Sequence, residues 1–292
     1  MRCFLVVAVS LVLMPGTLLS SNEPAVTKAD QIIIWNRIKE GNEATHQLLL
    51  VALKLSKSQF GDYVIRYTDR MEQGRVVREL KNNERVHVAL FAPDISREVD
   101  LKAIKIPVTK GLLGHRVCLI KKGNEHRFDD VYSLEDWRKR NLTIGQGLHW
   151  PDTRVLKHNG ISVVTNSLYL PLFNMLEKGR FDCFSRSVNE VLDEYKKHGS
   201  DNIVIEPRLL LVYKLPMYFF VSQQNNKLAQ RIFFGLKKAK ENGEYDKIFN
   251  HYYVKDLEPL NLESRVRINL ENPFLTDETL ELLDLPENKT PE

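Results

Sequence analysis

The sequence predicts an α/β protein of two lobes joined by two strands that cross between them. Strand-like apolar runs alternate with helix-like segments in two separate stretches, the pattern of mainly parallel sheets covered by helices. One further apolar strand precedes the second stretch and another follows it, as expected if the chain crosses into a second lobe and returns. The length of 292 residues agrees with this division, since domains contain roughly 150 residues.

The first stretch reads as a βαβαβ run. Apolar residues at helical spacing indicate its helices, and short runs rich in isoleucine, valine and tyrosine indicate its strands. We expect strands at residues 31–35, 63–67 and 86–91, with helices at 44–56 and 73–81.

The second stretch repeats this alternation. We expect strands at residues 143–145, 161–164 and 181–184, with helices at 152–159, 169–178 and 188–197. The crossing strands are expected at residues 116–120 and 217–221, and two helices at 227–241 and 244–253 follow. This order predicts a lobe 1 of residues 22–113 and 209–270, a lobe 2 of residues 114–208, and a C-terminal tail of residues 271–292. We expect the acidic, proline-containing tail to be an extended wrap or a frayed end.

Residues 1–21 have the composition of a secretory signal peptide. Arg2 is the one charged residue among them, an apolar run follows it, and Pro15-Gly16 breaks that run. An uncleaved anchor is the alternative, but the run is short for the ~20 apolar residues of a membrane span. The sequence therefore predicts an exported, periplasmic protein with a cleaved signal peptide.

Charge and composition exclude several classes of function. The 42 Lys+Arg and 38 Asp+Glu residues are interleaved along the chain, so no basic patch predicts nucleic-acid binding. The 3 cysteines form no C-x-x-C pair, which excludes a disulfide scaffold and a zinc ribbon. Cys118 and Cys183 lie in apolar, strand-like sequence, and we expect buried free thiols rather than a catalytic thiolate or a bridge.

Motifs for catalysis, metals and cofactors are missing from the sequence. The histidines are scattered without metal-ligand spacing, and there is no phosphate loop, H-E-x-x-H or G-x-S-x-G motif. Residues 145–150 begin like a dinucleotide loop, but Trp150 stands where the third glycine belongs. We therefore expect no cofactor, no metal and no enzymatic activity.

Three blocks of sequence carry a resemblance to a known family. They are residues 133–147 (SLEDW followed by TIGQG), 177–182 (EKGRFD) and 243–249 (GEYDKIF). In this order they resemble the periplasmic solute-binding proteins of polar amino-acid ABC transporters, bacterial extracellular solute-binding protein family 3. The chain is most similar to a divergent branch of that family. The resemblance implies a type II periplasmic binding fold, the Venus-flytrap architecture, with two hinge-crossing strands and a ligand in the cleft.

In lobe 1 the resemblance assigns the ligand carboxylate to Arg97. A planar, permanently charged guanidinium suits that role because it can donate two parallel hydrogen bonds. A surface ion pair with Asp94 or Asp100 is the alternative for Arg97. Phe91 and Ala92 precede it as further pocket candidates. The hydroxyl-bearing positions of the family correspond to Ala89, Leu90 and Ala92, whose side chains cannot donate, so backbone N–H groups would have to serve.

In lobe 2 the resemblance assigns the ligand site to the loop before a helix and to the end of a later strand. Leu148, His149 and Trp150 form the loop. The acidic residue that holds a ligand ammonium in the family corresponds to Ser187, with Arg186 beside it. A cation where the family has an anion favours a ligand with a second acid group or without an ammonium; a solvated helix start is the alternative for Arg186. Further pocket candidates are Tyr169 and Asn189.

The resemblance therefore implies an exported, monomeric protein that captures a small anionic or amino-acid-like ligand. It would present this ligand to a membrane permease of the ABC type or to a sensor. Two alternatives stay open at the level of sequence. One is an exported dehydratase or lyase on the same fold, and the other is an interaction subunit with a degenerate cleft.

Overall fold

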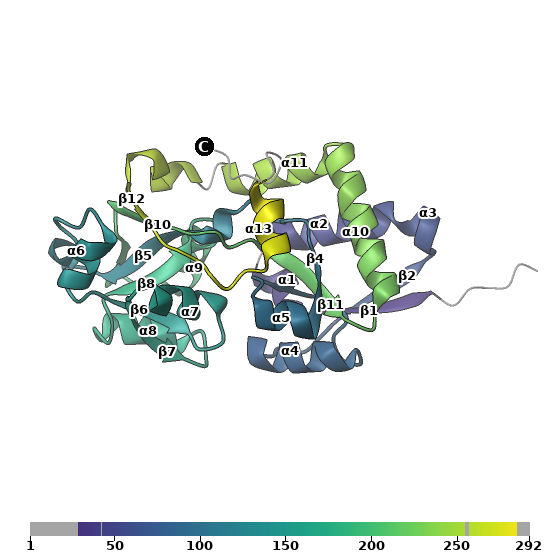
Figure 1. The fold of residues 1–292 in the computed structure, drawn as a ribbon, viewed down its shortest axis with the longest axis horizontal. Coiled ribbons are helices and arrows are strands. Elements are labelled where there is room, and N and C mark those ends of the chain that lie inside the picture. The colour runs from purple at the N-terminus through teal and green to yellow at the C-terminus, as the bar shows by residue number, and fades with distance from the viewer. Residues whose placement is uncertain (1–28, 42, 255–256, 285–292) are drawn as a thin grey trace, which may run out of the picture.

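Figure 1 shows the chain, in a computed structural model, as two lobes lying side by side. The structure describes residues 29–41, 43–254 and 257–284. The signal peptide expected at residues 1–21 lies outside the described residues. None of the helices in the described ranges combines the length and the apolar character that a membrane span requires.

Lobe 1 contains two small sheets. Its strands are β1 (Asp30–Ile34), β2 (Tyr63–Tyr67), β3 (Ala89–Phe91), β4 (Leu101–Ile104) and β11 (Tyr218–Ser222). β1 pairs in parallel with β2, and a parallel bridge from Ile34 to Val88 brings the segment before β3 to the same sheet. β11 pairs antiparallel with both β3 and β4. The expected βαβαβ run is therefore confirmed, although the third strand is shorter than predicted.

Helices cover the lobe 1 sheets. They are α1 (Asn36–Gly41), α2 (Glu43–Leu55), α3 (Lys57–Phe60), α4 (Gln73–Asn82), α5 (Ile95–Asp100), α10 (Asn226–Glu241) and α11 (Glu244–Phe249). Gly235 allows α10 to pack closely on α2, because a Cβ at that position would lie 1.9 Å from the carbonyl oxygen of Ala52. The two helices bury Leu49, Leu53 and Ile232 in the same apolar core.

Lobe 2 is built on one larger sheet with the strand order β12-β10-β5-β8-β6-β7, and β9 pairs with β5. Its strands are β5 (His115–Lys121), β6 (Thr143–Gly147), β7 (Ser162–Asn166), β8 (Cys183–Ser187), β9 (Ile203–Ile205), β10 (Leu209–Val212) and β12 (Val266–Asn269). Its helices are α6 (Leu134–Lys139), α7 (Pro151–His158), α8 (Pro171–Glu177) and α9 (Val191–His198), with 3₁₀ turns η1 (Leu112–Gly114) and η2 (Glu125–Arg127).

β8 extends further along the chain than the sequence predicted. The strand was expected at residues 181–184, but it pairs with β5 as far as Ser187. Arg186 therefore lies inside a central strand, and the interpretation of this residue as a solvated helix start is wrong. Antiparallel pairing with β5 outweighs the polar character of residues 185–187.

The chain passes between the lobes more often than expected. β10 pairs with β5 and β12, so the chain returns to lobe 1 after residue 212 rather than before residue 209. Beyond α11, η3 (Asn250–Val254), η4 (Glu258–Leu260) and η5 (Leu262–Ser264) lead back to β12 in lobe 2.

The C-terminal tail contains a helix, α13 (Asp277–Asp284), which packs on lobe 1. Thr279 donates a hydrogen bond to Glu98 (3.0 Å), and Lys105 bridges Glu98 and Glu278. In lobe 2, Asn159 exchanges hydrogen bonds with the backbone of Glu271. The tail therefore links the two lobes, as Figure 1 shows for the yellow segment.

Cys118 and Cys183 form a disulfide bond, so the expectation of two free thiols is wrong. Their sequence separation of 65 hides the fact that β5 and β8 are adjacent strands. Both residues are buried at this strand pair, which crosses the centre of the lobe 2 sheet. The bond thus fixes β5 beside β8.

We predict that the double variant Cys118→Ala/Cys183→Ala is less stable than the native chain. Closing a loop of this length restricts the unfolded chain, which typically contributes about 2–4 kcal/mol to stability. Denaturant unfolding with and without dithiothreitol measures the effect. Reductant should destabilise the native chain and leave the variant unchanged; equal midpoints for the native chain in both conditions would contradict the prediction.

Candidate functional site

A cavity of about 290 Å³ lies between the two lobes. Lobe 1 contributes residues of α1, the start of α4 and the end of β3, and lobe 2 contributes residues of β5, α7, β8 and α9. This volume is near the lower end of small-molecule pockets, which span roughly 300–1,000 Å³. The cavity therefore suits a ligand of the size of an amino acid.

Arg186 forms the charged centre of the lobe 2 wall. Its side chain is 3% exposed and binds two carboxylates of the α9 region. Nε and one terminal nitrogen donate to the two oxygens of Glu194, both at 2.5 Å, and the same terminal nitrogen donates to Glu190 at 2.9 Å. Tyr169 donates its hydroxyl to Glu194 at 2.7 Å. This wall is a closed network of one cation, two carboxylates and a phenol.

Aromatic rings enclose the same guanidinium. The Cζ atom of Arg186 lies 4.7 Å from the ring centroid of Trp150, 5.1 Å from that of Phe184 and 5.6 Å from that of Tyr169. Gly147 makes room for the indole, because a Cβ there would lie 2.5 Å from Trp150 Cε2. Ring faces attract cations, so they stabilise the buried charge together with the carboxylates.

The two glutamates respond differently to this environment. Burial raises the pKa of Glu190, and attraction to Arg186 offsets only part of that increase. Burial also tends to raise the pKa of Glu194. The charge and hydrogen bonds of Arg186, together with the hydrogen bond from the Tyr169 hydroxyl, outweigh burial and hold this pKa below its usual value. Glu194 is therefore the firm counterion of Arg186, and Glu190 takes up a proton first as the pH falls.

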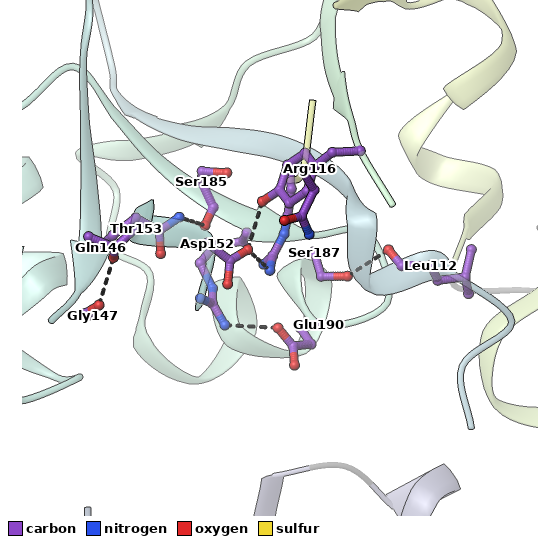
Figure 2. Close-up of polar contacts among 12 residues, drawn as sticks. Leu112, Arg116, Gln146, Gly147, Asp152, Thr153, Ser185, Ser187 and Glu190 are labelled. Atoms are coloured by element: carbon purple, nitrogen blue, oxygen red, sulfur yellow. Dashed lines mark hydrogen bonds and ion pairs between the residues drawn. The ribbon is translucent and has the colours of Figure 1, made fainter. Parts of the chain in front are cut away.

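Arg116 provides a second buried guanidinium at the floor of the cavity. Figure 2 shows it beside Asp152, to which it donates a hydrogen bond. Asp152 begins α7 and also accepts a hydrogen bond from the Tyr213 hydroxyl at 2.7 Å. Tyr213 follows β10, so this contact fixes the first turn of α7 against the segment that returns to lobe 1.

Within the described residues, two buried polar atoms that belong to residues of the cavity lining have no hydrogen-bond partner. They are Nε of Arg116, whose side chain is 2% exposed, and Oδ1 of Asn36. Arg116 belongs to lobe 2 and Asn36 to lobe 1. A buried donor or acceptor without a partner costs about 1–3 kcal/mol, so each of these atoms favours a ligand group that satisfies it. One is a donor for an anion, and the other is an acceptor for an N–H group.

The charges of the buried and half-buried side chains that line the cavity cancel. Three cations face three carboxylates: Arg37, Arg116 and Arg186 against Asp152, Glu190 and Glu194. The other charged side chains of the lining lie at its more exposed mouth. The interior consequently has no excess of positive charge. Within the described residues, no group of histidine, cysteine and acidic side chains is arranged to hold a metal ion.

The lobes touch one another around the cavity. The Cζ atom of Arg37 lies 4.9 Å from the ring centroid of Tyr169, and Arg154 of α7 lies 4.0 Å from Asp94 at the start of α5. A Cβ built on Gly74 would lie 3.2 Å from the His149 ring. The cleft is therefore described here in a closed arrangement.

Five of the ten residues proposed from the sequence line this cavity. They are Phe91, Ala92, Trp150, Tyr169 and Arg186. The other five lie beside it: Arg97, Leu148, His149, Ser187 and Asn189. Leu148 and His149 are exposed, and the Ser187 hydroxyl shares its one proton between two acceptors, the carbonyl of Leu112 (3.0 Å) and Asn189 Oδ1.

Arg97 of α5 is buried, and its side chain is turned back toward the end of β3. Its guanidinium donates to the carbonyl of Ala92 and lies 4.7 Å from the ring centroid of Phe91. The alternative of a surface ion pair does not describe it, because the side chain is buried and Asp94 accepts from the backbone N–H of Arg97 instead. Its role toward a ligand stays a proposal.

The sequence interpretation missed the acids and the second arginine. The family pattern places an acidic residue at Ser187. The acidic side chains of this wall are instead Glu190 and Glu194, about one and two helical turns further along the chain. The spacing of four residues from Glu190 to Glu194 was a usable signal, because residues four apart fall on one side of a helix, and α9 begins directly after Glu190. Nothing in the sequence marked Arg116.

Known structures share this fold. No protein-family model and no curated protein sequence matches the chain. An ancestral arginine-binding protein bound to arginine is 20% identical, with a TM-score of 0.53 over 70% of this chain and 85% of that one. A Salmonella typhimurium periplasmic binding protein with high arginine specificity is 15% identical, with a TM-score of 0.57 over 77% and 100% of the two chains.

A third similar structure extends the comparison. The ancestral amino-acid-binding protein AncCDT-1, a precursor of cyclohexadienyl dehydratase, is 16% identical, with a TM-score of 0.52 over 70% of this chain and 85% of that one. At these identities the likeness concerns the fold. It confirms the two-lobed α/β architecture of periplasmic binding proteins that the sequence resemblance implied.

We predict that Gly74→Trp holds the lobes apart. An indole at this position would occupy the space of the His149 ring, which already lies within contact distance of a Cβ. Small-angle X-ray scattering should give the variant a larger radius of gyration than the native chain. Asn82→Trp, at the exposed other end of α4, is the matched control. Superimposable scattering of Gly74→Trp and the native chain would refute the prediction.

Proposed function

We propose that this chain is an exported solute-binding protein that holds one small, amino-acid-like zwitterion between its lobes. The observation that carries the proposal is the cavity with one partnerless donor, Arg116 Nε, and one partnerless acceptor, Asn36 Oδ1, on opposite lobes. A carboxylate would accept from Arg116, and an ammonium would donate to Asn36. Each end of such a ligand satisfies one atom that is otherwise buried at a cost.

The balance of charge favours a zwitterion over a ligand with a second acid group. The sequence-based expectation of an acidic ligand relied on Arg186 having no acid beside it. Glu190 and Glu194 neutralise that cation. A dicarboxylate would bring a second negative charge to a lobe 2 wall whose two arginines, Arg116 and Arg186, are already paired with carboxylates.

Binding would act through the relative position of the lobes. A ligand that contacts both lobes stabilises the closed state over the open one by its differential affinity for the two. A dissociation constant near 1 μM corresponds to about −8 kcal/mol. One charge-assisted anchor at Arg116 and the apolar walls of Trp150 and Phe91 suffice for such an affinity.

The setting of this activity is inferred from several observations together. The Cys118–Cys183 disulfide suits an oxidising compartment, and the apolar N-terminal run suits export. Proteins of similar fold include the substrate-binding protein of an amino-acid ABC transporter. We propose that the chain acts as a periplasmic monomer that presents its ligand to a membrane permease or a sensor.

An enzyme on the same fold is the second candidate function. Glu190 lies in the cavity with a pKa raised by burial, which is a property of general acids. The similar structure AncCDT-1 is described as a precursor of a dehydratase. Glu190 is already hydrogen-bonded to Arg186. This contact favours a structural role and places binding ahead of catalysis.

We predict that Arg116→Lys weakens ligand binding about 10- to 100-fold. Lysine retains a cation for Asp152 but lacks the Nε–H group, and a hydrogen bond to a charged group contributes about 1.5–3 kcal/mol. Isothermal titration calorimetry with the tightest amino acid from a screen measures the change. Arg265→Lys is the matched control, because Arg265 is buried but hydrogen-bonded to backbone carbonyls away from the cavity.

The same titration tests the assignment of Arg97. If Arg97→Lys weakens binding and Arg116→Lys does not, the carboxylate anchor is Arg97, as the family resemblance implies. Native affinity in both variants would refute an arginine anchor altogether.

We predict that neutral amino acids raise the melting temperature more than dicarboxylates, and that simple amines or carboxylic acids have no effect. A zwitterion engages both partnerless atoms, whereas each simple compound engages one. Differential scanning fluorimetry of the purified chain tests this order. Mass spectrometry should recover the stabilising compound unchanged after incubation, since turnover would establish the enzyme instead. A complete lack of stabilisation would favour a degenerate cleft.

A further inference from the structure

We infer that Arg186 is a specificity-determining residue of the proposed solute site. Its guanidinium fills a pocket suited to a guanidinium group, so ligands with a cationic side chain are excluded. We call this pocket the guanidinium box; its walls are Trp150, Tyr169, Phe184, Glu190 and Glu194. This inference rests on the proposed function, and it names the class of ligand that the site refuses.

The box has the elements by which proteins recognise a planar cation. Glu194 accepts two hydrogen bonds from the guanidinium, one from Nε and one from a terminal nitrogen, in the bidentate geometry of an arginine–carboxylate pair. Glu190 accepts a third. Aromatic ring centroids lie 4.7–5.6 Å from Cζ, within the range of cation–π attraction.

Two other buried arginines differ from Arg186. Arg265 donates to the backbone carbonyls of Leu260, Glu206 and Leu209, and Arg231 donates to that of Gly61 and to Ser56 and Asp30. These hydrogen bonds connect segments that are distant in the sequence, and the residues involved do not line the cavity.

Arg186 instead lines the cavity, and within the described part of the chain its hydrogen bonds go to the side chains of the two glutamates. It therefore occupies space that a ligand's side chain would otherwise reach.

Structures of similar fold include an ancestral arginine-binding protein bound to arginine and a Salmonella typhimurium periplasmic binding protein with high arginine specificity. Here the chain supplies a guanidinium of its own inside the cleft. A second cation could not enter the box, because both carboxylates are already paired and the rings already cover a charge. Removal of the Arg186 side chain should leave the box open to an external guanidinium.

The test is chemical rescue of Arg186→Ala by methylguanidinium chloride at millimolar concentration. We expect this salt to raise the melting temperature of Arg186→Ala and to leave that of the native chain unchanged, relative to equal concentrations of methylammonium chloride. L-Arginine should bind Arg186→Ala at least about tenfold more tightly than it binds the native chain. Both readouts are independent of the identity of the natural ligand.

Two matched variants locate the effect in the box. Arg186→Lys keeps a cation there and should show no response to methylguanidinium. Arg186→Ala/Glu194→Gln removes the bidentate acceptor and should lose the response of the single variant. A response of equal size in Arg186→Lys or in the Glu194→Gln double variant would overturn the inference.

Folding of the alanine variant is itself a readout, because the two glutamates lose their counterion. If Arg186→Ala does not fold alone, refolding with methylguanidinium should recover soluble protein, and refolding with methylammonium should not. Recovery in neither salt or in both salts would overturn the inference. The proposed function fails separately, if no zwitterion stabilises the native chain.

Discussion

Two guanidinium groups are buried close together in this protein, and the arrangement of the cleft depends on pairing them. The β5–β8 register sets Arg116 opposite Ser187 and Val117 opposite Arg186, so the two cations sit on neighbouring strands. Each repels the other and each loses its hydration. Three carboxylates offset these costs, and they come from the starts of α7 and α9. The positions of both helices at the cleft are thereby linked to the sheet below them.

Much of the fold could be predicted from the sequence, because its elements are local and strongly patterned. The alternation of strands and helices, the bracketing strands and the helices α2 and α10 follow from apolar periodicity and were expected close to their observed bounds. The Cys118–Cys183 bond and the pairing of β10 with β12 were not expected, since both depend on which strands become neighbours. The helix in the tail was also missed, because an acidic segment with prolines resembles a frayed end.

The site was predictable only in part. Family spacing led to Arg186, Trp150 and Tyr169, which all line the cavity. It missed Glu190 and Glu194 because the acid was sought at one aligned position, whereas a helix can supply it one turn later. Arg116 lies in an apolar strand whose sequence favours a structural role, and its contact with Asp152 depends on tertiary packing. The positions of Arg116 and Asp152 in the sequence do not reveal that the two side chains form a contact in the folded protein.

The buried ion pairs themselves argue for a role in recognition. Apolar residues of similar volume usually stabilise a protein as well as a buried ion pair does, and often better. A cleft that only had to close would be expected to use such residues, as the core between α2 and α10 does. Here Arg116 keeps one nitrogen without a partner although it is almost fully buried. Buried polar groups whose hydrogen bonds are incomplete concentrate at functional sites, where a ligand makes the missing hydrogen bond.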